Sequence, residues 1–194
     1  MKIIGITGGI GSGKSVISKL MEIKGIPVYN SDIEAKRVTD SSSVIKQKLI
    51  DKFGASLYKE EHLDREALAS IVFNQPESLS YLNSIIHPEV FKDFSRWQKT
   101  FSTKKMVAIE SAILFESGLN KLTNLNIAVS APEALRIKRV MQRENSEERN
   151  ILNRIKNQMP EKERNSLADY IIFNDNRKAL IPQIENILSK LNIQ

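Results

Sequence analysis

Short apolar runs and stretches of helical periodicity alternate along this chain. Five runs have the length and apolar character of buried strands: residues 3–6, 26–29, 106–109, 125–129 and 170–173. Elsewhere apolar residues recur at every third or fourth position, as they do over 16–21 and 180–191. Strands that alternate with helices in this way predict an α/β fold built on a doubly wound parallel five-stranded sheet.

The second and third predicted strands are separated by a long insertion of helical character. Apolar residues at helical spacing predict a helix over 44–53, which Gly54 can end. Asp64 is a suitable N-cap for a helix over 65–73, and Pro76 can open the next helix. Because the residue before a proline is driven out of helical space, we expect His87-Pro88 to interrupt that helix. The pattern therefore predicts a helical insert at 33–103.

The segment between the first strand and the first helix carries the most specific motif in the chain. It reads Gly8-Gly9-Ile10-Gly11-Ser12-Gly13-Lys14-Ser15 and fits the phosphate-binding P-loop, G-x-x-x-x-G-K-[ST]. Glycines let backbone N–H groups approach a phosphate, the lysine supplies an ammonium group, and the serine hydroxyl can join a Mg²⁺ shell. We expect a nucleoside triphosphate to be held by Gly9, Gly11, Ser12, Gly13, Lys14, Ser15 and Val16.

Three polar residues lie just past the ends of other predicted strands. The carboxyl ends of parallel strands form the ligand-binding edge of such a sheet, so Asp32 and Glu110 are expected to face the same crevice. Glu110 could hold a Mg²⁺-bound water or could simply end its strand. Asp32 could instead cap the following helix. Asn174 is expected to border the adenine pocket.

Composition limits the kinds of metal site, cross-link and partner that this protein can have. The chain has 194 residues, no Cys, two His and a net charge of +6, which excludes disulfides and Cys-based zinc sites. The most basic stretch, 136–164, has few aromatic residues and no RNA-binding signature, so nucleic acid is not expected as a partner. No run reaches membrane-spanning length and no signal peptide is visible, so we expect a cytoplasmic protein, monomeric or weakly self-associating.

Three classes of P-loop protein compete at this point. A GTPase would carry Asn-Lys-x-Asp after a late strand, but the strand at 125–129 is followed by Ser-Ala-Pro-Glu-Ala. A motor or transport ATPase would need partner domains that this chain lacks. A small-molecule kinase needs the P-loop, an acid near the acceptor, an acceptor-binding insert and an arginine-bearing lid. The sequence offers a candidate for each of these parts.

The chain also resembles one family of such kinases along most of its length. The resemblance rests on Gly5-Ile6-Thr7 with the P-loop, Asp32, Leu63-Asp64-Arg65, His87-Pro88, Ile113-Leu114-Phe115-Glu116, Arg139, Arg143, Arg154, Gln158, Ala168-Asp169-Tyr170 and Asn174. In this order they resemble the dephospho-CoA kinases, which phosphorylate the ribose 3′-hydroxyl of dephospho-CoA with ATP. Three positions depart from the family pattern: Ala112 replaces Pro, Arg136 replaces Gln, and Glu110 replaces Asp.

The resemblance implies roles for residues outside the P-loop. Asp32 would orient the acceptor hydroxyl, and Arg65, His87 and Leu114 would contact dephospho-CoA. Arg139 and Arg143, one helical turn apart, would close over the ATP phosphates, unless they belong to a solvated helix face. The implied division is a nucleotide-binding core at 1–32, 104–136 and 164–194, an acceptor insert at 33–103 and a lid at 137–163.

Two other functions stay open at this stage. The chain could be a different small-molecule kinase that acts on a nucleoside or nucleotide. It could also be a non-enzymatic module that binds a nucleotide without turnover. Phosphate transfer to adenosine or a nucleoside monophosphate would indicate the former, and tight ATP binding without turnover would indicate the latter.

Overall fold

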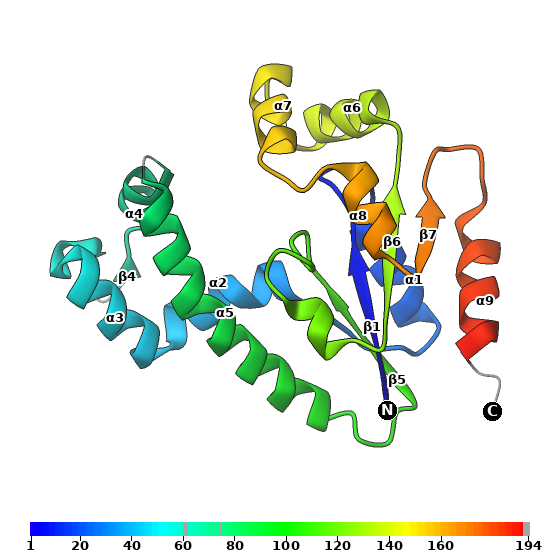
Figure 1. Cartoon of the computed structure of the whole chain (residues 1–194), viewed down its shortest axis with the longest axis horizontal. Helices are drawn as coiled ribbons and strands as arrows, with labels where there is room; N and C mark the ends of the chain where they lie inside the picture. Colours follow the sequence, from blue (N-terminus) through cyan, green and yellow to red (C-terminus); the bar gives the residue numbers. More distant parts are fainter. Residues whose placement is uncertain (60–61, 74, 192–194) are drawn as a thin grey trace. The chain divides into compact units, whose positions relative to one another are not determined.

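A computed structural model describes residues 1–59, 62–73 and 75–191 of the chain (Figure 1). The chain divides into two compact units, Ser31–Thr100 and the combination of Met1–Asn30 with Phe101–Gln194. Because the second strand ends at Asn30, the division places Asp32 in a different unit from the P-loop.

The larger unit is built on the predicted parallel sheet. Its strands are β1 (Lys2–Thr7), β2 (Val28–Asn30), β5 (Met106–Glu110), β6 (Leu125–Ser130) and β7 (Tyr170–Phe173). They lie in the order β2-β5-β1-β6-β7, and every pairing is parallel. This confirms the predicted fold class, with strand β2 starting two residues later than the apolar run suggested.

Helices α1 (Lys14–Ile23) and α9 (Leu180–Leu191) pack against this sheet and supply the rest of its core (Figure 1). The other helices of this unit are α6 (Glu133–Glu144), α7 (Glu148–Lys156) and α8 (Glu161–Leu167), with a short 3₁₀ helix at Leu119–Leu122. Ile4, Ile6 and Ile127 of the strands are fully buried together with Ile17 of α1 and Ile184 of α9. Burying each such side chain stabilises the fold by about 1.5–3 kcal/mol of transfer free energy. Because parallel strands are buried on both faces, their sequences are nearly continuous apolar runs.

The smaller unit is mainly helical, as expected for the insert. Its helices are α2 (Ser31–Ser41), α3 (Ser43–Phe53), α4 (Arg65–Phe73) and α5 (Pro76–Lys99), with a 3₁₀ turn at Ala55–Leu57. Gly54 ends α3 with a φ of 92°, and the Asp64 side chain caps α4 by accepting a hydrogen bond from the Ala67 N–H (3.0 Å). The pattern did not predict the antiparallel pair β3 (Tyr58–Lys59) and β4 (His62–Leu63), because two-residue strands are too short to show a period.

Helix α5 corrects the expected break at His87-Pro88. The helix is continuous over 24 residues and includes Pro88. A proline inside a helix costs about 3 kcal/mol, because it removes one hydrogen bond and its ring crowds the preceding turn. Buried side chains on both sides of it, Ile85, Val90 and Phe94, each contribute a comparable amount, so packing outweighs the local preference. Despite its length, neither α5 nor any other helix in the described ranges is apolar enough to span a membrane.

Candidate nucleotide-binding site

The carboxyl edge of the sheet gathers polar residues from several strands of the larger unit. Ile6, just before the P-loop, pairs in register with Glu110, and Asn30 pairs with Glu110 from the other side. At the other end of the sheet the Asn174 N–H donates to the Ser130 carbonyl (2.8 Å). Parallel strands thus bring the end of β1, Asn30, Glu110 and Asn174 to the edge where ligands bind in such folds.

The P-loop adopts a conformation that its glycines make possible. Gly11 and Gly13 have φ values of 75° and 93°, in the left-handed region that other residues rarely adopt. Space is also restricted, because a Cβ at Gly13 would lie 2.1 Å from Nδ2 of Asn174. The Ser12 N–H closes the loop on the Gly9 carbonyl (3.1 Å). The loop is therefore a tight backbone cradle of the kind that surrounds a phosphate.

Lys14 and the start of helix α1 give this cradle its positive charge. The Lys14 ammonium donates to the Gly8 carbonyl (2.9 Å), so its side chain folds across the loop. Gly13 precedes α1, and among the described residues no side chain caps this end of the helix. Its first-turn N–H groups and the helix dipole favour an anion here. The buried Ser12 hydroxyl, which has no hydrogen-bond partner in the described part of the chain, also fits a loop shaped for a polar ligand.

Two oxygen-bearing side chains at this edge suit a divalent cation. Ser15 is exposed at the start of α1, and Glu110 is buried at the end of β5, where its Oε2 accepts from Nδ2 of Asn30 (3.4 Å). Hydroxyl and carboxylate oxygens are ligands that Mg²⁺ prefers, and Mg²⁺ commonly takes its other ligands from water and phosphate. Within the described ranges no three His, Cys, Asp or Glu side chains gather as a complete metal cage. The oxygen chemistry of Ser15 and Glu110 fits a Mg²⁺ that takes its remaining ligands from water and phosphate.

Asn174 and Arg139 lie against the P-loop backbone. Asn174 is buried, and its Nδ2 donates to the Ser12 carbonyl (2.8 Å). Arg139 of α6 donates to the Gly11 carbonyl (3.4 Å), to the backbone and side-chain oxygens of Asn174 (3.1 and 3.2 Å), and to Asn176 Oδ1 (2.7 Å). Both residues thus contact the loop, while the predicted closure of Arg139 over the ATP phosphates and the predicted contact of Asn174 with adenine stay predictions.

Arg143, one turn further along α6, has different surroundings. Its exposed guanidinium pairs with Glu144, which also pairs with Arg154 of α7. The two hydrogen bonds from Arg143 and Arg154 lower the pKa of Glu144. In this arrangement Arg139 reaches the P-loop, whereas Arg143 is held at the surface between the two helices.

Three of the four residues expected on the acceptor side, Asp32, Arg65 and His87, lie in the smaller unit. Asp32 lies in the first turn of α2, inside the helix rather than at the N-cap position. Arg65 donates to the Lys36 carbonyl (3.0 Å) and pairs with Asp40 (2.7 Å). Burial lowers the pKa of His87, which keeps its imidazole neutral near pH 7 and suits it to hydrogen bonding more than to charge pairing.

Leu114, the fourth residue expected to contact the acceptor, has a different environment in the larger unit. Its side chain is fully buried, and a Cβ at Gly5 would lie 2.8 Å from it. This placement makes Leu114 a core residue and does not support a side-chain contact with substrate.

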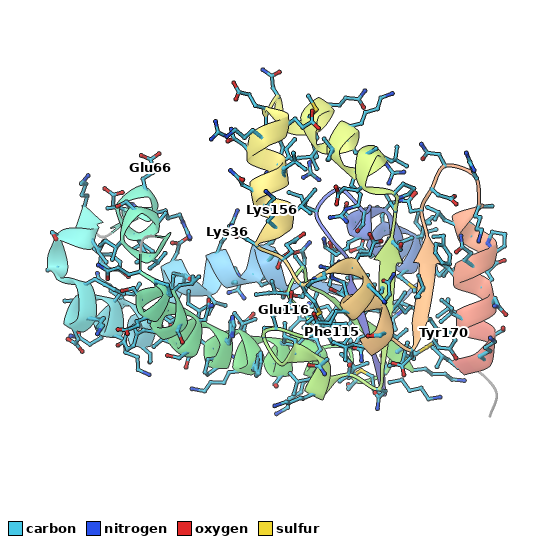
Figure 2. The ribbon with its side chains drawn as sticks, turned by 45° about the horizontal axis from the view of Figure 1, so that its top comes forward. Lys36, Glu66, Phe115, Glu116, Lys156 and Tyr170 are labelled. Atoms are coloured by element: carbon cyan, nitrogen blue, oxygen red, sulfur yellow. The ribbon has the colours of Figure 1, made fainter. Side chains whose placement is uncertain are left out.

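The structure adds residues to which the sequence assigned no role. Gln158 and Glu161 lie at the junction of α7 and α8. Gln158 and Arg136 contact the backbone of the P-loop, and Glu161 contacts Arg136. The same junction is anchored on the other side by Glu116, whose Oε1 accepts from the Met159 N–H (3.3 Å), and Figure 2 labels Glu116 beside it. None of these contacts follows from local sequence spacing.

The central parallel strand, the glycine cradle and the uncapped helix that follows define a nucleotide-binding protein of the P-loop kinase class. A family model described as dephospho-CoA kinase matches residues 2–179. The chain belongs to the dephospho-CoA kinase family.

Relatives and solved structures agree with this assignment. The dephospho-CoA kinase of Porphyromonas gingivalis is 43% identical over 189 residues, which cover 97% of this chain and 93% of that protein. The crystal structure of TT1252 from Thermus thermophilus matches with a TM-score of 0.80 and 32% identity, covering 98% of this chain and 95% of that one. Dephospho-CoA kinase from Campylobacter jejuni matches with a TM-score of 0.71 and 26% identity over 98% of both chains.

Proposed function

We propose that this protein transfers the γ-phosphoryl group of ATP to the ribose 3′-hydroxyl of dephospho-CoA, the last step of coenzyme A synthesis. The observation that carries the proposal is the glycine cradle with Lys14 folded across it, in a chain matched over residues 2–179 by the family model. In the reaction the bond between the γ-phosphorus and the β–γ bridging oxygen breaks. A bond from the ribose 3′-oxygen to that phosphorus forms, ADP leaves, and the hydroxyl proton passes to a base.

The nucleotide half of the site acts through charge and position. The loop amides and the first turn of α1 hold the β- and γ-phosphates, and the Lys14 ammonium exchanges its contact with the Gly8 carbonyl for the transferring group. Ser15, and Glu110 through a water, would hold Mg²⁺, which when bound neutralises phosphate charge. Asn174 and Arg139 keep the loop in shape from outside.

The acceptor half is assigned to the smaller unit. Asp32, two residues after β2, would accept or orient the proton of the attacking hydroxyl. Arg65 presents a planar fork of donors suited to a phosphate of dephospho-CoA, for which it would release Asp40. The neutral His87 imidazole would donate or accept a hydrogen bond. The proposal also takes the protein to act in the cytoplasm as a monomer or weak homo-oligomer.

Replacing Arg143 should separate catalysis from nucleotide binding. Since its guanidinium is exposed and paired with Glu144, it can meet a phosphate only after the lid moves. Arg143→Ala should therefore lower kcat by about tenfold, the value of one charge-assisted hydrogen bond, with little change in ATP affinity when acceptor is absent. Calorimetry with ATP alone and steady-state kinetics measure the two quantities. The matched control is Arg149→Ala on α7, and equal losses in both quantities for Arg143→Ala would indicate a static clamp instead.

An ADP-release assay against a panel of acceptors tests the proposed function. With ATP and Mg²⁺, dephospho-CoA should give by far the highest kcat/KM, above adenosine, AMP and other nucleoside monophosphates. Highest activity with adenosine or a monophosphate would instead indicate a nucleoside or nucleotide kinase. Tight ATP binding with no turnover on any acceptor would indicate a non-enzymatic nucleotide-binding module.

A further inference from the structure

The tip of the P-loop, Ile10, is held by side chains from distant parts of the larger unit. Its carbonyl accepts a hydrogen bond from Nε of Arg136 on α6 (2.9 Å). Its N–H donates to Oε1 of Gln158, between α7 and α8 (2.8 Å). Both backbone groups of this one residue are therefore satisfied by side chains and not by the loop itself.

The side chain of Ile10 strengthens the same attachment. It is 9% exposed and packs with Ile137 and Val140 of α6 and Ile151 of α7. These residues form a small apolar cluster between the two helices, separate from the core of the sheet. The loop tip is thus packed against helices of the predicted lid segment, in addition to being continuous with the strand that precedes it.

Arg136 is fixed firmly enough to act as a template for the loop. It is 4% exposed, and its Nη1 pairs with Oε2 of Glu161 (3.3 Å), whose other oxygen accepts from the Ser130 hydroxyl. A Cβ at Gly9 would lie 2.4 Å from Nη2 of Arg136, and one at Gly11 would lie 2.4 Å from the Arg136 carbonyl. Two P-loop glycines are therefore in close contact with this one residue.

We propose that Arg136 and Gln158 are positioning residues for ATP, acting through the Ile10 peptide groups. By fixing the two peptide units that meet at Ile10, they set the direction in which the N–H groups of the following loop residues point. Preorganised donors bind a phosphate without first having to be ordered, so their loss weakens nucleotide binding more than it slows the chemical step. Arg136 is buried, with its guanidinium on the Ile10 carbonyl and Glu161.

This inference rests on the nucleotide-binding role proposed above and gives the α7–α8 junction a part in it. Movement of that junction would pull Gln158 from the Ile10 N–H.

Gln158 offers the sharper test, because it is only partly buried and its replacement leaves no buried charge. Gln158→Met keeps the length of the side chain and removes the acceptor, whereas Gln158→Glu retains an acceptor oxygen. Losing one hydrogen bond to a backbone group should raise the Kd for ADP and the KM for ATP by about fivefold. The kcat, the KM for dephospho-CoA and the melting temperature should stay close to wild type. Gln142→Met, on the surface of α6, is the matched control.

Arg136→Lys tests the other contact while keeping a positive charge opposite Glu161. The single lysine ammonium cannot reproduce the contacts that the guanidinium makes with both the Ile10 carbonyl and Glu161. We therefore expect a rise in the Kd for ADP of the same order as for Gln158→Met. If either variant binds ADP as tightly as wild type, its residue has no positioning role. If Gln158→Glu is as weak as Gln158→Met, or if the weaker binding follows a fall in melting temperature, the contact is merely structural. Because ADP affinity is measured without an acceptor, these results stand even if dephospho-CoA proves not to be the substrate.

Discussion

Lys14→Ala should lower kcat by about a hundredfold or more, because a preorganised charge at the transferring phosphate contributes roughly 2–4 kcal/mol to lowering the barrier. In the structure the ammonium already lies across the loop on the Gly8 carbonyl, within the cradle that would surround a phosphate. Steady-state kinetics with saturating ATP and dephospho-CoA measure the effect. A melting curve shows whether removing the contact with Gly8 also loosens the loop.

Lys19→Ala is the matched control for this substitution. Lys19 lies on the same helix, with an exposed ammonium paired with Glu22, so its replacement removes the same charge at a distance from the loop. It should turn over like the wild type. Near-normal turnover of Lys14→Ala would contradict the assignment of the P-loop as the phosphate-transferring site.

Asp32→Asn should lower kcat by roughly a hundredfold to ten-thousandfold, as expected when a general base is lost. The low end of this range applies if the transition state is loose, since the attacking hydroxyl then needs less help. ATP affinity should be unchanged. The melting temperature should change little, because an acid in the first turn of a helix contributes only about 0.3–1 kcal/mol through the helix dipole.

The same variant also distinguishes a catalytic role from a purely helical one. If Asp32 only supported the start of α2, Asn would lose no more than the small helix-dipole contribution, and both stability and rate would stay near wild type. Asp51→Asn, on α3 and bonded to Gln47, is the control for a carboxylate lost from an exposed helix surface. Wild-type turnover in Asp32→Asn would remove this residue from the catalytic machinery.

Local patterns were enough to predict the sheet and the phosphate cradle. Five apolar runs gave the five strands because a parallel strand is buried on both faces and shows its burial directly in the sequence. The P-loop could also be predicted from the sequence, because its glycines are required by local backbone angles and by close contacts around the loop. The cap at Asp64 and the stop at Gly54 belong to the same class of local signal.

Features decided by distant contacts were not predictable in this way. Pro88 lies within a continuous helix because residues on both sides of it are buried in the core. The conformational preferences of single residues do not include this packing energy. Arg136 and Gln158 meet Ile10 across 126 and 148 residues of sequence. Arg136 could therefore be noticed only as a departure from the family pattern, and its partner Glu161 not at all. The roles of Asp32, Arg65 and His87 remain predictions that rest on the family resemblance.

The position of the transferred phosphate tests the central claim most directly. The protein is incubated with ATP, Mg²⁺ and dephospho-CoA, and the product is identified by mass spectrometry and phosphorus NMR. The account predicts coenzyme A with a new phosphomonoester on the ribose 3′-oxygen, formed in equal amount to ADP and not formed by Lys14→Ala at a comparable rate. ADP released without any phosphorylated dephospho-CoA, or a phosphate on another hydroxyl, would contradict it.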